Sequence, residues 1–428
     1  MSDRPTVVFF PEGAYGPTNN CVGIGDVLRS RGHRVVFIVE ESFAGTLEAQ
    51  GFEERLMRLG PPPETEEVPG QFWKDFVAEN APVFRRPTIE QIEGFMAPTY
   101  QALVDGSRYV DDRLVEIIDE LQPDVVVEDN VVSFPALLVS GRPWVRVVSC
   151  NSLELPDPSL PPPYSGLPVG DPSDWDAFRA EYRRVMSPVH AGFDDFCRSR
   201  GAPALPDLEF THPSGWLNLY GYPSEVDYSR SVPLGSSWHN VQASVRGTEG
   251  AWEAGLPDGD GPLVYLSLGS LGSADVLLMQ QLIDVLGTSP YRVIVSMGPR
   301  SDELTLASNM VGQEFLPQTK VLPSVDLVIT HGGNNTVVES LYFGKPMVLL
   351  PLFWDQHDNA QRMHETGFGV RLSTYGHSPE ELLGAIERLR SDSALASRLA
   401  ECSARLRSHG GAADAASQIE QVAVAAAV

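Results

Sequence analysis

Short apolar runs alternate with longer amphipathic segments over the first 150 residues of the chain. Four of these runs predict β-strands, at residues 6–10, 34–40, 124–129 and 144–149. They are predominantly apolar rather than alternating, which is typical of strands covered by helices on both faces of a parallel sheet. Helices are expected between them, over about residues 20–30 and from near Val131. This order predicts βαβ units and a doubly wound α/β sheet.

A second set of the same kind follows after a break. Its predicted strands lie at residues 263–268, 292–297, 313–316, 327–331 and 347–352. A helix over residues 378–392 begins with a capping box, because Ser378 and Glu381 are three positions apart and Pro379 takes the first helical position. The break, residues 246–261, is rich in Gly, Asp and Glu and lacks periodic apolar positions, which indicates an interdomain linker.

The two sets predict two Rossmann-like domains, because 428 residues exceed what one ordinary core accommodates. The N-terminal domain is expected over residues 1–245, the linker over 246–261 and the C-terminal domain over 262–405. Residues 406–428 form an expected helical tail, whose last helix starts near residue 411.

The charge balance bears on the classes of partner. Asp and Glu total 57 against 31 Lys and Arg, a formal net charge of -26 without a basic run, so nucleic acids and anionic membrane surfaces would be repelled. No stretch approaches about 18 apolar residues, and no signal-peptide pattern is visible. The four cysteines are scattered, which is typical of reduced thiols. We expect a cytoplasmic protein, monomeric or homodimeric, without nucleic-acid or membrane partners.

The most informative segment is residues 331–362, HGGNNTVVESLYFGKPMVLLPLFWDQHDNAQR. A predicted strand runs into the His-Gly-Gly turn of residues 331–333 and then into a helix. The free N–H groups and positive dipole end of such a helix bind anions, and the glycines let a diphosphate approach the backbone. One helix and one strand later, Asp355 and Gln356 supply a carboxylate and an amide suited to sugar hydroxyls.

This segment resembles the donor-binding signature of family 1 glycosyltransferases, including actinobacterial natural-product and macrolide-type enzymes. The resemblance extends upstream to residues 314–318 (EFLPQ) and 267–270 (SLGS). It implies the GT-B fold, in which two Rossmann-like domains face each other across a cleft. It also implies inverting transfer of a hexose from a nucleoside diphosphate to a hydrophobic small-molecule acceptor. No Asp-x-Asp pair stands where a metal-dependent transferase holds Mg²⁺, so neither a metal nor a cofactor is expected.

The resemblance also assigns roles to individual positions. Beside the diphosphate it places His331, Asn335 and Thr336, together with Gly333 and Ser270. Around the nucleoside it places Phe315, stacked on the base, Gln318, and Glu339 on the ribose. Asp355 and Gln356 contact the hexose. The ribose contact and the fully hydroxylated hexose favour UDP-glucose, and a dTDP-hexose is the alternative because both bases stack on Phe315.

The acceptor side departs from the family. Relatives place a general-base His at the end of the first loop, and here Pro17 occupies that position, without an ionisable group. The carboxylate that orients the His is matched by Asp129. Either Asp129 serves as the base, with Glu12, Tyr15 and Asp26 as weaker candidates, or the acceptor is an amine or already ionised. Otherwise the protein transfers poorly.

Two further functions stand beside the transferase. One is a catalytically weak or silent GT-B protein that binds a nucleotide sugar or assists a partner transferase, and the other is a sugar-nucleotide epimerase. For the acceptor, the Pro-rich loop 155–170 and residues 71–109 are expected to form the lips of a pocket. Aromatic residues that suggest a hydrophobic acceptor are Phe72, Trp73, Phe76, Phe84, Phe95, Trp216 and Tyr220.

Overall fold

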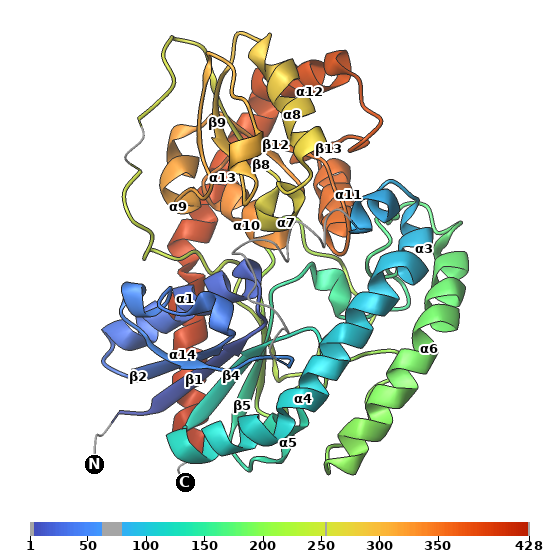
Figure 1. Cartoon of the computed structure of the whole chain (residues 1–428), viewed down its shortest axis with the longest axis vertical. Coiled ribbons are helices and arrows are strands. Elements are labelled where there is room, and N and C mark those ends of the chain that lie inside the picture. Colours follow the sequence, from blue (N-terminus) through green and yellow to red (C-terminus); the bar gives the residue numbers. More distant parts are fainter. Residues whose placement is uncertain (1–3, 62–78, 253–254, 427–428) are drawn as a thin grey trace.

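The computed structural model describes residues 4–61, 79–252 and 255–426. They form two α/β domains, one above the other in Figure 1, each built on a parallel sheet. The predicted fold class is therefore confirmed. No helix of the described residues combines the length and the apolar character that crossing a bilayer requires.

The first sheet has seven parallel strands in the order β3-β2-β1-β4-β5-β6-β7. They are β1 Thr6–Pro11, β2 Arg34–Val39, β3 Glu53–Leu56, β4 Val125–Asp129, β5 Trp144–Val148, β6 Leu217–Tyr220 and β7 Trp238–Asn240. The second sheet has six, in the order β10-β9-β8-β11-β12-β13. They are β8 Leu263–Ser267, β9 Arg292–Ser296, β10 Met310–Gln313, β11 Leu327–Thr330, β12 Met347–Leu349 and β13 Gly369–Arg371.

Strand order reverses between β1 and β4 in the first sheet and between β8 and β11 in the second. In open α/β sheets, ligands bind beyond the carboxyl ends of the strands at such a point. The helices of the N-terminal domain are α1 Tyr15–Ser30, α3 Thr88–Gln91, α4 Ala97–Leu121, α5 Pro135–Val139 and α6 Trp175–Ser199. Those that follow are α7 Gly269–Gly272, α8 Val276–Gly287, α9 Gln318–Val321, α10 Asn334–Tyr342, α11 Gln356–Thr366, α12 Pro379–Ser391, α13 Ser393–His409 and α14 Gly411–Ala426.

Three predicted boundaries are wrong. Helix α1 begins at Tyr15 rather than near residue 20, because a proline in the first turn lacks only an N–H that has no intrahelical partner there. The strand expected at 313–316 is β10, Met310–Gln313. It is an edge strand paired only with β9, so its exposed positions hide the apolar signal. The helix expected from Val131 begins at Pro135.

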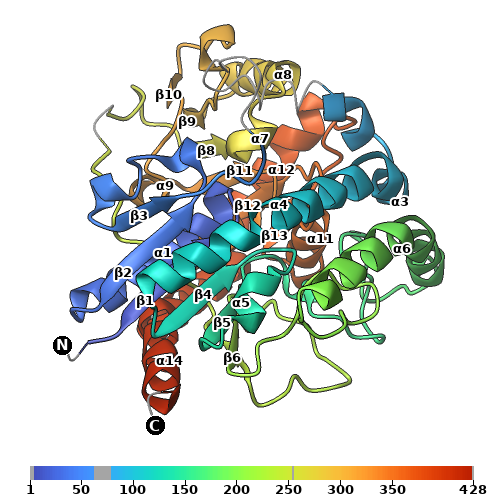
Figure 2. The same ribbon diagram turned by 60° about the horizontal axis from the view of Figure 1, so that its bottom comes forward.

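The last helix returns to the N-terminal domain. Figures 1 and 2 both show α14 beside the strands of the first sheet. Its Ala415, Ile419 and Ala423 share a buried cluster with Val7 and Phe9 of β1. The predicted helix near residue 411 is thus confirmed, and it completes the core of the first sheet. The capping box of α12 at Ser378 is also present.

Candidate functional site

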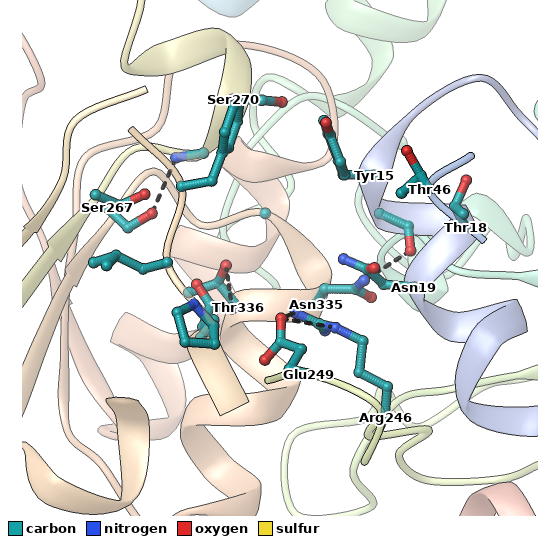
Figure 3. Close-up of a pocket in the computed structure, with 18 of the residues that line it drawn as sticks. Tyr15, Thr18, Asn19, Thr46, Arg246, Glu249, Ser267, Ser270, Asn335 and Thr336 are labelled. Atoms are coloured by element: carbon teal, nitrogen blue, oxygen red, sulfur yellow. Dashed lines mark hydrogen bonds and ion pairs between the residues drawn. The ribbon is translucent and has the colours of Figure 1, made fainter. Parts of the chain in front are cut away.

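A cleft of about 570 Å³ lies between the two domains, beyond the carboxyl ends of β1 and β11. Figure 3 shows Tyr15, Thr18 and Asn19 of α1 on one side and Ser267, Ser270 and Thr336 on the other. Of the predicted donor residues, those that line it are Ser270, Phe315, Gln318, His331, Gly333, Asn335 and Thr336. The structure therefore gathers most of the predicted donor site in one place.

His331 is packed between two glycines at the wall of the cleft. A Cβ atom would lie 2.8 Å from His331 Nε2 if added at Gly269 and 2.5 Å from it if added at Gly333, so neither position admits a side chain without displacing the ring. Burial lowers the pKa of His331 to about 4. The imidazole is therefore neutral at pH 7 and has a single N–H, for which the backbone of Ser267 competes with an anion.

The N-terminus of α10 follows directly and faces the same cleft. Gly333 is its N-cap residue, and no side chain caps the helix, so its first N–H groups are free to face an anion. Asn335 Nδ2 donates to the carbonyl of Gly16 at 2.7 Å. Asn334 Nδ2 donates to the carbonyl of Ser149 at 2.8 Å. These two amides tie the turn at the start of α10 to the N-terminal domain.

A buried polar network forms the floor at the other end of the cleft. Gln318 Nε2 donates to Glu339 at 2.7 Å and to Thr336 Oγ1 at 3.3 Å. Glu339 lies below the surface of the cleft, where Arg246 Nη1 approaches its Oε1 at 2.5 Å. The Arg246 guanidinium also pairs with Glu249, whose Oε2 accepts from the N–H and hydroxyl of Thr319.

Arg246 and Glu249 belong to the cleft although the sequence did not reveal them. Both line the cleft, yet both belong to the segment predicted as a linker. Their only signal in the sequence was an arginine and a glutamate three positions apart in a run otherwise dominated by Gly and acidic residues. Tyr15 was considered only as a weak base candidate. Its ring lies 5.8 Å from that of Phe315, and these two exposed aromatics face each other from opposite domains.

Asp355 and Gln356, the predicted hexose contacts, are not among the described residues that line the cleft. Asp355 Oδ2 accepts from the backbone N–H of Asn151 at 2.9 Å. Gln356 Oε1 accepts from the N–H groups of Leu352 and Phe353. Two residues later, Asp358 accepts from the N–H of Tyr164 at 2.6 Å, so this part of the chain holds loops of the N-terminal domain.

Three carboxyl groups lie at the carboxyl ends of β1 and β4, and one of them belongs to the predicted base, Asp129. Asp129 is buried, with Oδ1 accepting from Ser149 Oγ at 3.0 Å and Oδ2 without a partner among the described residues. Burial raises the pKa of Asp129 well above its ordinary value. Burial likewise raises the pKa values of Glu12 and Glu128 to about 7.

Pro17 lies in the first turn of α1 and is not among the described residues that line the cleft. Glu12 adjoins Asp129, the predicted base. Its backbone N–H donates to the carbonyl of Asp129 at 2.9 Å. Its Oε2 accepts from the N–H of Val131 at 3.3 Å.

A second cavity, of about 410 Å³, lies within the N-terminal domain. The Pro-rich loop predicted as a lip does line it, with Pro156, Pro158 and residues 161–164. From the other predicted lip, Tyr100 is the described residue that does so. The remaining walls come from α6, from residues 207–211, and from Val131 and Glu154.

The aromatic residues proposed from the sequence lie elsewhere. Phe84 and Phe95 pack against Phe353 in the core, with ring centroids 4.8 and 5.1 Å away. Trp216 is exposed and Tyr220 is buried in β6. The other three, Phe72, Trp73 and Phe76, fall outside the described residues. The rings that line the second cavity are Tyr100, Tyr164, Phe178, Tyr182 and Phe210.

Comparison with known proteins matches residues 240–402 to the family described as UDP-glucoronosyl and UDP-glucosyl transferase. The chain is 23% identical over 410 residues to the NDP-glycosyltransferase YjiC of Bacillus subtilis (strain 168), covering 95% of this chain and 94% of that one. It is 24% identical over 425 residues to the demethyllactenocin mycarosyltransferase of Streptomyces fradiae, covering 97% and 86%. The crystal structure of the glycotransferase of kitacinnamycin has a TM-score of 0.71 at 21% identity, covering 99% of this chain and 100% of that one. This likeness confirms the predicted two-domain fold.

Proposed function

We propose that this chain, whose residues 240–402 match the UDP-glucoronosyl and UDP-glucosyl transferase family, transfers glucose from UDP-glucose to a hydrophobic small-molecule acceptor with inversion. A dTDP-hexose is the alternative donor. The observation that carries the proposal is the wall of the cleft, where neutral His331 and the uncapped start of α10 are placed to contact the same anion.

The proposed reaction is a single displacement. An acceptor atom attacks the anomeric carbon, the bond from that carbon to the diphosphate oxygen breaks, and the electron pair leaves with the nucleoside diphosphate. His331 and the N–H groups that open α10 stabilise the negative charge that develops on the leaving oxygen. Phe315 stacks on the base, while Gln318 and Glu339 bind the ribose side.

The hexose contacts are proposed to be Asp355 and Gln356. Among the described residues, Gln356 uses its Oε1 on backbone N–H groups and no hydrogen bond of its Nε2 is recorded, so this nitrogen is available to a sugar hydroxyl. Asp355 already accepts from Asn151 and Asn359, so its contact with the sugar would be made by a carboxylate fixed in place by the N-terminal domain.

Asp129 is the proposed base that takes the acceptor proton, directly or through one water. Its support is the place that it shares with the orienting carboxylate of relatives and an oxygen without a partner among the described residues. The raised pKa of Asp129 makes its carboxylate a strong proton acceptor once ionised. Glu12, whose pKa is raised by burial to about 7, is the alternative base.

The test is incubation of the protein with UDP-glucose or dTDP-glucose and a panel of aromatic alcohols, phenols and amines, followed by mass spectrometry. We expect a mass gain of one hexose on at least one acceptor, together with release of the nucleoside diphosphate. Binding of UDP without transfer from any donor would contradict the proposal and favour a silent protein that binds a nucleotide sugar or assists a partner transferase.

A further inference from the structure

The second cavity joins an aromatic wall to two carboxyl groups. The hydroxyls of Tyr100 and Tyr164 lie 3.1 Å apart on this wall. Glu154 and Glu209 line the same cavity. Glu154 lies on the loop that follows β5, and Glu209 lies on the segment that precedes β6.

Among the described residues, Arg146 is the cation within ion-pair distance of either carboxyl group, while Arg230 donates to the carbonyls of Ser152 and Leu155 on the same loop. Arg146 Nη2 lies 3.2 Å from Glu154 Oε1. Glu154 Oε2 is buried, and apart from the thiol of Cys150, a weak donor, it has no partner among the described residues. Glu209 makes no recorded side-chain hydrogen bond or ion pair within the described part of the chain. Burial and the charge of Glu154 raise the pKa of Glu209, so the two groups repel each other.

The other charged residues that line the cavity do not neutralise these two carboxyl groups. Arg183 pairs with Asp207 at 2.6 Å. Arg179 donates to the carbonyls of Pro158 and Leu160 and pairs with Asp176 at 3.5 Å, while Asp157 accepts only from uncharged groups. Four carboxyl groups thus stand against three guanidinium groups when Arg146 is included, a deficit of one positive charge.

We propose that this cavity binds the acceptor and that Glu154 and Glu209 select acceptors that carry a protonated amine. Aromatic rings attract an alkylammonium group through their π-faces, and a carboxylate without a partner accepts a charge-assisted hydrogen bond from the same group. The inference rests on the proposed transferase function, since it names the acceptor class of that reaction. The cavity is adjacent to the reacting groups, because Val131 lines it and donates to Glu12.

The test compares two phenols that differ at one group. Tyramine carries an ammonium group at pH 7, and 4-(2-hydroxyethyl)phenol carries a hydroxyl there, while both offer the same phenol as nucleophile. With UDP-glucose as donor, we expect the wild-type protein to favour tyramine in kcat/KM by about ten-fold or more, the size expected of a hydrogen bond to a charged group. Calorimetric titration of each phenol, without donor, measures recognition independently of transfer.

Glu209→Gln removes the charge while keeping the size of the side chain. We expect it to bring the two kcat/KM values, and the two affinities, to within about two-fold of each other. Glu181→Gln is the matched control, because Glu181 lies on α6 next to Tyr182 but pairs with Arg184 outside the cavity. It changes the net charge equally and should keep the wild-type preference.

The outcomes separate the inference from the function. Transfer with equal preference for the two phenols, or a preference unchanged in Glu209→Gln, overturns the amine selection and leaves the transferase standing. If no phenol is glucosylated, the titrations decide alone. Tighter binding of tyramine that is lost in Glu209→Gln supports the selection without the transferase, and equal or undetectable binding of both phenols overturns it.

Discussion

The guanidinium of Arg246 lies 2.5 Å from the carboxylate of Glu339, and both side chains are buried beneath the donor cleft. The two residues are 93 positions apart in the chain. Glu339 also accepts from Gln318, so the group proposed to bind the ribose is held from two sides. Removing either charge of such a pair leaves the other charge buried without its partner, which destabilises the folded state.

Glu339→Gln is therefore expected to lower the free energy of unfolding by about 3 kcal/mol, because Arg246 is left as a buried cation with only Glu249 beside it. UDP affinity should fall in the same variant. Urea denaturation followed by fluorescence measures the first effect and calorimetry the second. Glu116→Gln, which breaks the exposed pair with Arg113, should cost less than about 0.5 kcal/mol. Equal stability of the two variants would contradict the role given to the buried pair.

His331→Ala is expected to weaken UDP binding by roughly ten-fold or more, since a hydrogen bond to a charged group contributes about 1.5–3 kcal/mol. The pKa of His331, lowered to about 4 by burial, makes this donor neutral at pH 7, so the loss should be the same at pH 7 and pH 9. Calorimetry with UDP measures it. His364→Ala, at an exposed position of α11, is the control. Unchanged affinity in the His331 variant would remove the central residue of the proposed donor site.

Stability is expected to fall as pH rises from 6 to 8. Burial raises the pKa values of Glu12, Glu128, Asp355 and Asp358 to about 7. Each folded-state value lies above the unfolded one, so the stabilising contribution is fully present below the unfolded pKa and is lost through pH 7. Thermal unfolding at the two pH values measures this.

Asp358→Asn should make that fall in Tm smaller, because one titrating group is removed. The exposed Asp207, whose pKa is lowered by Arg183, provides the control, and Asp207→Asn should leave the fall unchanged. A Tm that is equal or higher at pH 8 in the wild-type protein would show that these carboxyl groups are not as buried in solution.

Asp129→Asn is expected to reduce transfer to hydroxyl acceptors by about 10²-fold or more, the usual contribution of a general base, while UDP binding persists. Glu12→Gln tests the alternative base. If Glu12 acts instead, its variant takes the larger loss and the rise of kcat/KM with pH near 7 disappears with it. Full turnover in the Asp129 variant would contradict its role. In that case Pro17→His should add activity towards phenols by placing an imidazole near the carboxylate.

The residues expected beside the diphosphate do line one cleft, because one continuous segment carries most of them. His331, Gly333, Asn335 and Thr336 occupy the turn after β11 and the start of α10, and local backbone geometry alone brings them together. The floor depends instead on a long-range ion pair. Nothing in the local pattern around Arg246 shows that it reaches Glu339, so a segment predicted only as a linker also lines the cleft.

The acceptor side shows the same limit. The Pro-rich loop does line the second cavity. Its prolines exclude it from helices and central strands, so the sequence could identify it as a loop. The aromatic residues proposed from the sequence do not line it, because the sequence does not distinguish an aromatic residue in the core from one in a cavity wall. Phe84 and Phe95 fill the core, while Tyr182 and Phe210 reach the cavity from elements far apart in the chain.

The return of α14 to the first sheet means that the polypeptide passes between the domains twice. Both passages meet at Gly411, where a Cβ atom would lie 2.1 Å from the carbonyl oxygen of Val241 and 2.2 Å from that of Ala243. The two passages are therefore fixed to each other at this contact, and a side chain at residue 411 would push them apart. The arrangement of the two domains thus depends on a position that is far in sequence from the cleft between them.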